Sequence, residues 1–510
     1  MDTQTIANCL ALQGHPAAVS SGPVDIVIDG ERIREIRPAG TTPAEGTVID
    51  GTDLLVTAGL INGHTHSHEN FTKGRYENLP LELWMNYVRP PDAVPYTARQ
   101  VYLRTMIGAI EALRSGTTTV VDDLNISPVL IPEHVEAVFQ AYEDSGLRAL
   151  VAPGMFDLPF FKAAPFVEET FPRALFEALG SKPRSSPDEV LAFVTPLLRE
   201  RQPRARRVGM AVSPSAPQRC SEAFLMRLRR LADDLDLPIV IHVQETRLQV
   251  VTGDIFYGST MVEYLDRIGF LRSGVSLIHG VWLNPREIEI LARSGATLQH
   301  NPTSNMSLGS GLCPVRELIE AGVNVSLGTD ACGSSFTINM LKAVNNAALV
   351  QKLRTPDYAR WVAAQEAWTA GTVNGARALG LGERIGTLAP GMVADLTGYR
   401  LSSCAFRPLN DPLRQLVYAE SGADLSLVMV DGERVMQDGR FTRFDEAALF
   451  DEIAAEHERL KPHLDAAEAG VSGIRQAYEA IYRRSLMHRI AEDTYPALFD
   501  APPSGRGHRH

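Results

Sequence analysis

The chain has 510 residues, of which 45% are hydrophobic and 22% are charged. Its 49 basic and 61 acidic side chains give a net charge of −12 at pH 7. This balance argues against nucleic acid as a partner, because phosphate binding needs a basic face. No stretch reaches the roughly 18 consecutive apolar residues of a membrane-spanning helix, so we expect no membrane partner either.

The cysteines and the first residues of the chain indicate the compartment. Five cysteines lie far apart in the sequence, and none of them forms a CxxC pair. An odd, scattered set is typical of reduced thiols rather than of a disulfide framework. Residues 1–10 lack the basic and apolar regions of a signal peptide. We therefore expect a cytoplasmic protein.

The two ends of the chain carry β-patterns. Residues 24–29 and 32–36 alternate around a Gly-containing turn, and a similar pattern returns at 425–430 and 433–436. These segments predict a small discontinuous β-sandwich, built from residues 1–55 and 389–444.

The middle of the chain, residues 56–388, alternates short apolar runs with longer helical patterns. Strands are predicted at 54–61, 117–122, 148–154, 208–213, 238–243, 275–279, 296–300 and 324–328. Helices are predicted at 98–115, 132–145, 221–236, 260–269, 285–294 and 315–321. Eight strand–helix alternations predict an α/β fold with a (β/α)8 TIM-type barrel, although the spacing also allows a doubly wound sheet.

The last part of the chain, residues 445–510, is rich in helix formers as far as residue 490 and ends in a polar segment. We interpret it as an amphipathic helical extension followed by a disordered tail.

Several predicted strands end in residues that bind metal ions. The first strand ends at His64 and His66, and the alternation of side chains along a strand allows both to reach one cation. Later strands end at His242, His279 and Asp330. Any one of these could be a hydrogen-bonded core residue, but catalytic groups of a barrel lie at the carboxyl ends of its strands.

Imidazoles with a carboxylate suit zinc, iron, manganese or cobalt, and we expect one divalent metal per chain, with zinc as first choice. The fourth strand end, residues 211–215, offers no lysine and no carboxylate to bridge a second metal. Glu245 follows His242 by three residues, and it could either move protons at the site or cap the following helix.

With these residues, the chain resembles the mononuclear aminohydrolase and chlorohydrolase branch of the amidohydrolase superfamily. The branch includes S-adenosylhomocysteine/methylthioadenosine deaminases, guanine deaminases and triazine hydrolases. The resemblance rests on segments in the family's order: GLINGHTH (59–66), HVQET (242–246), LIHG (277–280), QHNPTSNMSLGSG (299–311), LGTDACGSS (327–335) and IGTLAPGMVADL (385–396).

The resemblance implies that the metal ligands are His64, His66, His242 and Asp330. It implies that Glu245 is the proton shuttle and that Asp330 also orients the attacking water. His279 would polarise the electrophile or help to hold the hydroxide, and in some relatives it contacts the metal.

The substrate loops depart from the branch's nucleoside deaminases. Ser215 stands where those enzymes carry a histidine, and the acidic residue that binds a ribose is displaced toward Asp92. These departures argue against a phosphate-bearing or ribose-bearing substrate and favour a compact, fairly apolar or aromatic one. The substrate-binding candidates are Trp84, Asp92, Phe156, Ser215, Gln218 and His300.

We therefore expect a hydrolase that uses metal-bound hydroxide to cleave a C–N bond of a small molecule. The preferred reaction is the hydrolytic deamination of an amino-substituted heterocycle. Hydrolysis of an amide-like bond in a urea, carbamate or anilide, and dechlorination of a triazine-like ring, remain open. A catalytically silent barrel acting as an assembly subunit is a further alternative. We also expect a homo-oligomer, a dimer or larger.

Overall fold

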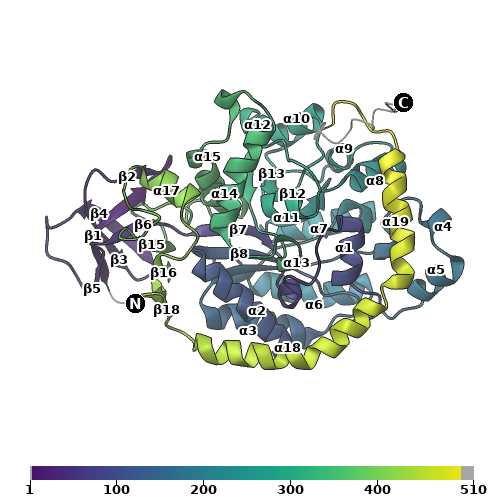
Figure 1. The fold of residues 1–510 in the computed structure, drawn as a ribbon, viewed down its shortest axis with the longest axis horizontal. Helices are drawn as coiled ribbons and strands as arrows, with labels where there is room; N and C mark the ends of the chain where they lie inside the picture. Colours follow the sequence, from purple (N-terminus) through teal and green to yellow (C-terminus); the bar gives the residue numbers. More distant parts are fainter. Residues whose placement is uncertain (1–2, 495–510) are drawn as a thin grey trace, which may run out of the picture.

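The computed structural model describes residues 3–494 and consists of an α/β barrel, a β-sheet beside it and two long C-terminal helices (Figure 1). Within the described residues the barrel has eight parallel strands. They are β7 (Leu60–Thr65), β8 (Thr117–Leu124), β9 (Arg148–Pro153), β10 (Val208–Met210), β11 (Ile239–Val243), β12 (Val275–His279), β13 (Thr297–His300) and β14 (Asn324–Leu327). The predicted fold class is confirmed.

The barrel closes through two short connections between its four-stranded halves. A parallel bridge joins Val212, just after β10, to Ile239 at the start of β11. On the other side the backbone N–H of Asp330 donates to the carbonyl of His64 at 2.9 Å. The strands are buried on both faces, as expected where helices cover a parallel sheet. Closure brings the carboxyl ends of all the strands to one rim.

Helices surround the barrel, and several begin where the sequence provides a cap. Thr97 and Gln100 form a capping box at α2, and Asn284 and Glu287 form one at α10. The larger helices are α1 (Leu81–Val88), α2 (Ala98–Arg114), α3 (Pro132–Ser145), α5 (Arg173–Gly180), α6 (Pro187–Glu200), α7 (Glu222–Asp234), α8 (Arg247–Tyr257), α9 (Met261–Arg267), α10 (Pro285–Ser294), α14 (Met340–Val350) and α15 (Ala364–Gly371). Shorter ones are α4 (Val167–Thr170), α11 (Pro302–Ser307), α12 (Val315–Glu320), α13 (Cys332–Ser335), α16 (Val373–Ala378) and α17 (Pro412–Tyr418).

The two chain ends share one ten-stranded sheet beside the barrel (Figure 1). Its strands are β1 (Gln4–Gln13), β2 (Ala18–Val19), β3 (Val24–Asp29), β4 (Arg32–Pro38), β5 (Thr47–Asp50), β6 (Leu54–Ala58), β15 (Leu396–Arg400), β16 (Leu425–Val430), β17 (Glu433–Gln437) and β18 (Arg440–Phe441). β6 joins the two contributions, because it pairs with β1 on one side and with β15 on the other.

The strand predicted at 54–61 is in fact divided between the two sheets. β6 belongs to the outer sheet and β7 to the barrel, with Gly59 between them. A Cβ atom at Gly59 would lie 2.2 Å from the side chain of Thr118, so only glycine allows the chain to pass so close to β8. Hydrophobicity is continuous across this break, which is why the sequence pattern did not reveal it.

The two C-terminal helices run along the edge of the barrel (Figure 1). α18 (Glu446–Ala469) packs on α2, and α19 (Ser472–Met487) packs on α1, α4 and α8. Their inner faces bury apolar side chains such as Leu460 and Ile481. Both helices lie within the predicted extension, whose terminal segment 495–510 lies outside the described residues.

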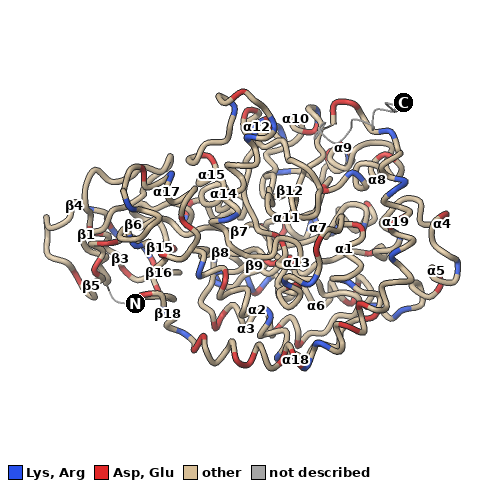
Figure 2. The backbone as a smooth tube through the Cα atoms, in the orientation of Figure 1, with Lys and Arg blue, Asp and Glu red and all other residues tan. Residues whose placement is uncertain are grey.

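Basic and acidic side chains are interspersed along the backbone rather than separated onto opposite faces (Figure 2). Among the described residues, no helix has both the length and the apolar character required to cross a membrane.

A buried ion-pair network attaches the outer sheet to the barrel. Arg148, at the start of β9, donates from Nε and Nη2 to the two carboxylate oxygens of Asp395 and also pairs with Asp431. Arg207 pairs with Asp431 and with Glu433 at 2.9 and 2.8 Å. This network lies at the amino ends of the barrel strands, the face of a barrel that serves stability.

Replacing Arg148, whose side chain is only 3% exposed, should therefore destabilise the protein. We expect Arg148→Met to lower the free energy of unfolding by about 3–5 kcal/mol, because Asp395 keeps a buried and unpaired charge. Urea denaturation followed by circular dichroism measures the change. Arg173→Gln, at a side chain that is 92% exposed, is the matched control and should change stability by less than about 0.5 kcal/mol. Equal effects of the two substitutions would contradict this role of Arg148.

Candidate metal centre and active site

Four histidines from three barrel strands converge at the carboxyl rim. His64 and His66 come from the end of β7 and the residue after it, His242 from β11 and His279 from β12. The ring centroid of His64 lies 4.6 Å from that of His66, 4.9 Å from that of His242 and 5.9 Å from that of His279. All four were predicted from their positions in the sequence, and the structure brings them together.

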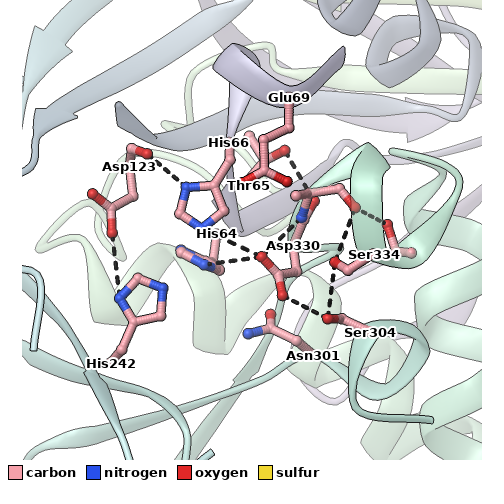
Figure 3. A network of polar contacts seen from close by, with 12 residues as sticks. His64, Thr65, His66, Glu69, Asp123, His242, Asn301, Ser304, Asp330 and Ser334 are labelled. Carbon is pink, nitrogen blue, oxygen red and sulfur yellow. Dashed lines mark hydrogen bonds and ion pairs between the residues drawn. The ribbon is translucent and has the colours of Figure 1, made fainter. Parts of the chain in front are cut away.

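Asp330, three residues after β14, lies among these rings (Figure 3). Its Oδ1 is 3.4 Å from Nε2 of both His64 and His66, and its Oδ2 is 3.9 Å from Nε2 of His279. The Oδ2 atom also accepts a hydrogen bond from Ser304 at 2.6 Å. The carboxylate is thus fixed with its oxygens toward the imidazoles.

Hydrogen bonds orient three of the rings in the same way. Nδ1 of His66 donates to the carbonyl of Asp123 at 2.6 Å, and Nδ1 of His242 donates to the carbonyl of Ser215 at 2.9 Å. Nδ1 of His279 donates to Oδ1 of Asn305, also at 2.9 Å. An N–H at Nδ1 leaves the lone pair on Nε2, so each ring is held in the tautomer of a metal ligand.

The backbone is strained at the ends of the strands. His279 has φ 75°, Asp330 φ 61°, Ser215 φ 61° and Gln244 φ 50°. Residues other than glycine rarely adopt these values, and such residues cluster at functional sites. The strain turns the side chains of this rim into positions that regular strands would not provide.

The donor set fits a divalent cation. Burial lowers the pKa of His66 to about 3 and that of His279 to about 4, so these imidazoles are neutral. Burial opposes ionisation of Asp330, yet the close His64 imidazole and the other histidines hold its pKa well below the usual range. Both ring nitrogens of buried His64 lack a hydrogen-bond partner among the described residues. Neutral nitrogens around an ionised carboxylate are the ligands that zinc and similar metals prefer.

Asp123 was missed by sequence reasoning, although it lies next to this cluster. It is buried near the end of β8, and its Oδ2 is 3.5 Å from Nδ1 of His242. One ligand-type atom from each of His64, His66, Asp123 and His242 lies within 4.8 Å of the others. The signal was present, because two acidic residues, Asp122 and Asp123, lie just before Leu124 at the end of β8.

Glu245 lies on the open side of the cluster, where its Oε2 is 3.5 Å from Nε2 of His279. Burial, and then the charge of Asp330, raise its pKa well above the usual range. The N-cap of α8 is Thr246, so the carboxyl group of Glu245 faces the histidines and not the first turn of the helix. A buried carboxyl group in this position can exchange protons with molecules bound beside the histidines.

A cavity of about 110 Å³ opens beside Glu245. Three of the predicted substrate-binding residues line it, namely Trp84, Ser215 and Gln218. Glu69, which had not been singled out, also lines it, and burial raises its pKa to about 7. The indole Nε1 of Trp84 donates to the carbonyl of Gly333 at 3.1 Å, which fixes this wall.

The structure places the other three substrate-binding candidates away from this cavity. Asp92 pairs with Lys182 at the surface, and its side chain is 75% exposed. Phe156 lines an adjoining cavity, where it packs against Arg219. His300 is buried at the end of β13 and does not belong to the lining of either cavity. Loop conformation, which sequence spacing does not specify, accounts for the position of Asp92.

A TIM-type barrel with neutral imidazoles and an ionised carboxylate at its carboxyl rim defines the class of metal-dependent barrel hydrolases. The model of the amidohydrolase family matches residues 55–435, and the chain belongs to this family. The expected enzyme class, a hydrolase acting on C–N bonds, is thereby confirmed.

Relatives and solved structures agree with this assignment. A 5-methylthioadenosine/S-adenosylhomocysteine deaminase of Thermococcus kodakarensis is 35% identical over 81% of this chain and 89% of its own. A 5'-deoxyadenosine deaminase of Methanothermobacter thermautotrophicus is 34% identical over 82% of this chain and 91% of its own. An adenosine deaminase from Xanthomonas campestris with bound zinc matches with a TM-score of 0.79 and 29% identity, over 90% of this chain and 98% of its own.

Proposed function

We propose that this protein is a metal-dependent aminohydrolase that removes the amino group from a small heterocycle by hydrolysis. The observation that carries the proposal is the position of Glu245, whose buried carboxyl group lines one cavity with His279 and Asp330 and lies 3.5 Å from Nε2 of His279. The similarity to deaminases of adenosine derivatives supports the same reaction class.

The proposed metal ligands are His64, His66, His242 and Asp330, with zinc as first choice and iron, manganese or cobalt as alternatives. A divalent metal held there lowers the pKa of water toward neutrality and so supplies a nucleophile. The zinc in the solved relative supports this choice. The oxygen Oδ1 of Asp330 lies close to two imidazoles, where it would bind the metal and orient the attacking water.

Glu245 would carry the proton from the attacking water to the departing nitrogen. Burial raises the pKa of Glu245 above its usual range, and a raised pKa makes its carboxylate a better proton acceptor in the first of these steps. His279, held by Asn305, would present Nε2 to the atom of the substrate that becomes negatively charged. The apolar surroundings of the cavity exclude competing water.

The inner cavity favours a flat ring as the substrate's reacting part. Trp84 and Leu81 provide apolar walls, while Ser215 and Gln218 provide polar groups that can position ring nitrogens. We place the enzyme in the cytoplasm as a homo-oligomer; the scattered cysteines, unpaired within the described residues, support the compartment. We also propose the domain boundaries given above for the barrel, the outer sheet and the extension, except that the first boundary moves from residue 55 to Gly59, because β6 belongs to the outer sheet.

A screen of metal-loaded enzyme against aminated heterocycles, ureas, anilides and chlorotriazines tests the proposed reaction. Release of ammonia from a heterocycle is the expected result. Release of an amine together with a carboxylate or carbon dioxide, or release of chloride, would show that the same site performs one of the other reactions. The absence of turnover on every class would contradict an enzymatic role.

The metal assignment predicts about one divalent cation per chain after purification, because the two groups of donor atoms that the structure brings together share His64. His66→Ala should lose most of that metal and lower the melting temperature. His463→Ala, at an exposed position on α18, is the control and should retain the metal and keep the melting temperature unchanged. Elemental analysis by mass spectrometry measures the metal. Full metal content in His66→Ala would remove His66 from the ligand set.

The proton-transfer role predicts that Glu245→Gln reduces kcat by about 10²–10⁴-fold, because an amide has the shape of the carboxyl group but cannot shuttle a proton. The metal content should stay unchanged, since Glu245 is not among the proposed ligands. Steady-state kinetics and metal analysis on the same preparation measure the two quantities. Unchanged turnover would exclude Glu245 from the mechanism.

A further inference from the structure

A second, larger cavity of about 420 Å³ adjoins the inner one. Four residues line both cavities and mark their junction, namely Arg89, Phe160, Arg219 and Tyr478. A substrate whose ring occupies the inner cavity therefore has room for a substituent that passes this junction. The proposed reaction makes no use of either arginine.

Arg219 is a buried cation without an ion-pair partner among the described residues. It is only 5% exposed, and its Nη1 donates to Oγ of Ser215 at 2.8 Å. Its guanidinium lies over the ring of Phe156 at 4.0 Å and near that of Phe160 at 5.4 Å. Its Nε has no hydrogen-bond partner within the described chain. The aromatic rings fix the plane of the guanidinium and leave its remaining donors available.

Arg89, which follows α1, is half-buried at the same junction. Its backbone N–H closes the helix on the carbonyl of Met85, while its side-chain Nε is buried without a partner in residues 3–494. Most surface arginines of this protein do pair with a carboxylate, as Arg99 does with Glu452 and Arg114 with Glu446. The two arginines at the junction are therefore unusual in having no acidic partner within ion-pair distance among the described residues.

We propose that Arg89 and Arg219 form a subsite for an anionic group, a carboxylate or a phosphate, carried by the substrate. This inference rests on the proposed deaminase function and defines its substrate class as an aminated heterocycle with an anionic substituent. Guanidinium groups match both anions through paired N–H donors.

The electrostatics of the junction agree with this assignment. Burial, and then the positive charge of Arg89, lower the pKa of Arg219 to about 9, so the two cations repel each other in a dry environment. The acids near this junction are engaged with histidines: Glu69 lies 3.4 Å from His68, Glu245 lies 3.5 Å from His279, and Asp123 belongs to the histidine cluster. Arg104, which is buried and lines the outer cavity, adds a third cation, stacked on Tyr96. A bound anion would compensate this excess of positive charge.

The C-terminal extension completes the subsite. Tyr478 of α19 is buried, lines both cavities and stacks near Phe160 at 6.0 Å between ring centroids. The family match ends at residue 435, so α19 lies beyond it. Arg247 on α8 anchors this helix by donating to the carbonyls of Ser485 and His488. A segment outside the residues that the family model matches thus forms a wall of the proposed anion site.

Direct binding to the metal-loaded enzyme tests the subsite without any knowledge of the substrate. The probes are phenylacetate, phenyl phosphate and the neutral phenylacetamide, titrated by calorimetry. We expect at least one of the anions to bind about tenfold more tightly than the amide, because hydrogen bonds to a charged group are the stronger kind. Whichever anion binds more tightly identifies carboxylate or phosphate as the group recognised.

Two variants connect this preference to the arginines. Arg219→Gln and Arg89→Gln should each reduce the preference for the anion to about twofold or less, and Arg219→Lys should restore part of it. Arg173→Gln removes one exposed positive charge that lines neither cavity and should keep the full preference. Circular dichroism checks the fold, and if Arg219→Gln is unfolded, Arg89→Gln decides.

Equal binding of the anions and the amide by the unmodified enzyme would overturn the subsite. So would an unchanged preference in a folded Arg89→Gln variant. These results are independent of the substrate screen: if the anions bind as expected but no heterocycle releases ammonia, the proposed function fails and the anion subsite stands.

Discussion

The structure depends on one electrostatic constraint, the crowding of four imidazoles and an ionised carboxylate in a dry barrel rim. Without a cation, buried lone pairs on His64 and its neighbours face one another and Asp330 with few donors to satisfy them. Burying such groups unpaired is costly, so the arrangement is stable only around a positive charge. Barrel closure, the bonds at Nδ1 and the strained backbone at His279 and Asp330 all serve to hold these atoms toward one point.

The sequence could predict the structural features that are encoded locally. Helices at 132–145 and 285–294 begin at a proline and end before a glycine, and the structure has these bounds. The histidines could be found because each one ends a hydrophobic run, and strand ends meet at one rim of a barrel. Asp123 shows the same signal near the end of β8, but an acidic residue at a strand end is less specific for a metal site than a histidine.

The rest could not be predicted because it depends on contacts between distant segments. The break at Gly59 is set by Thr118 on another strand, and Asp92 is drawn to the surface by Lys182, 90 residues away in the chain. Arg89 and Arg219 meet only when the first and fourth strand-following loops fold over the rim. The C-terminal extension joins these two arginines from the far end of the chain. Specificity therefore resides in the least predictable part of this enzyme, whereas its chemistry resides in the most predictable part.

The central claim, that these residues hold a single catalytic cation, is tested most directly by anomalous diffraction from crystals of the purified protein. Data collected on both sides of the absorption edge of the bound metal would locate it. The account predicts one strong peak, within bonding distance of Nε2 of His64 and His66, of the His242 ring and of the Asp330 carboxylate. A second peak of similar height in this site, or no peak among these side chains in an active preparation, would contradict it.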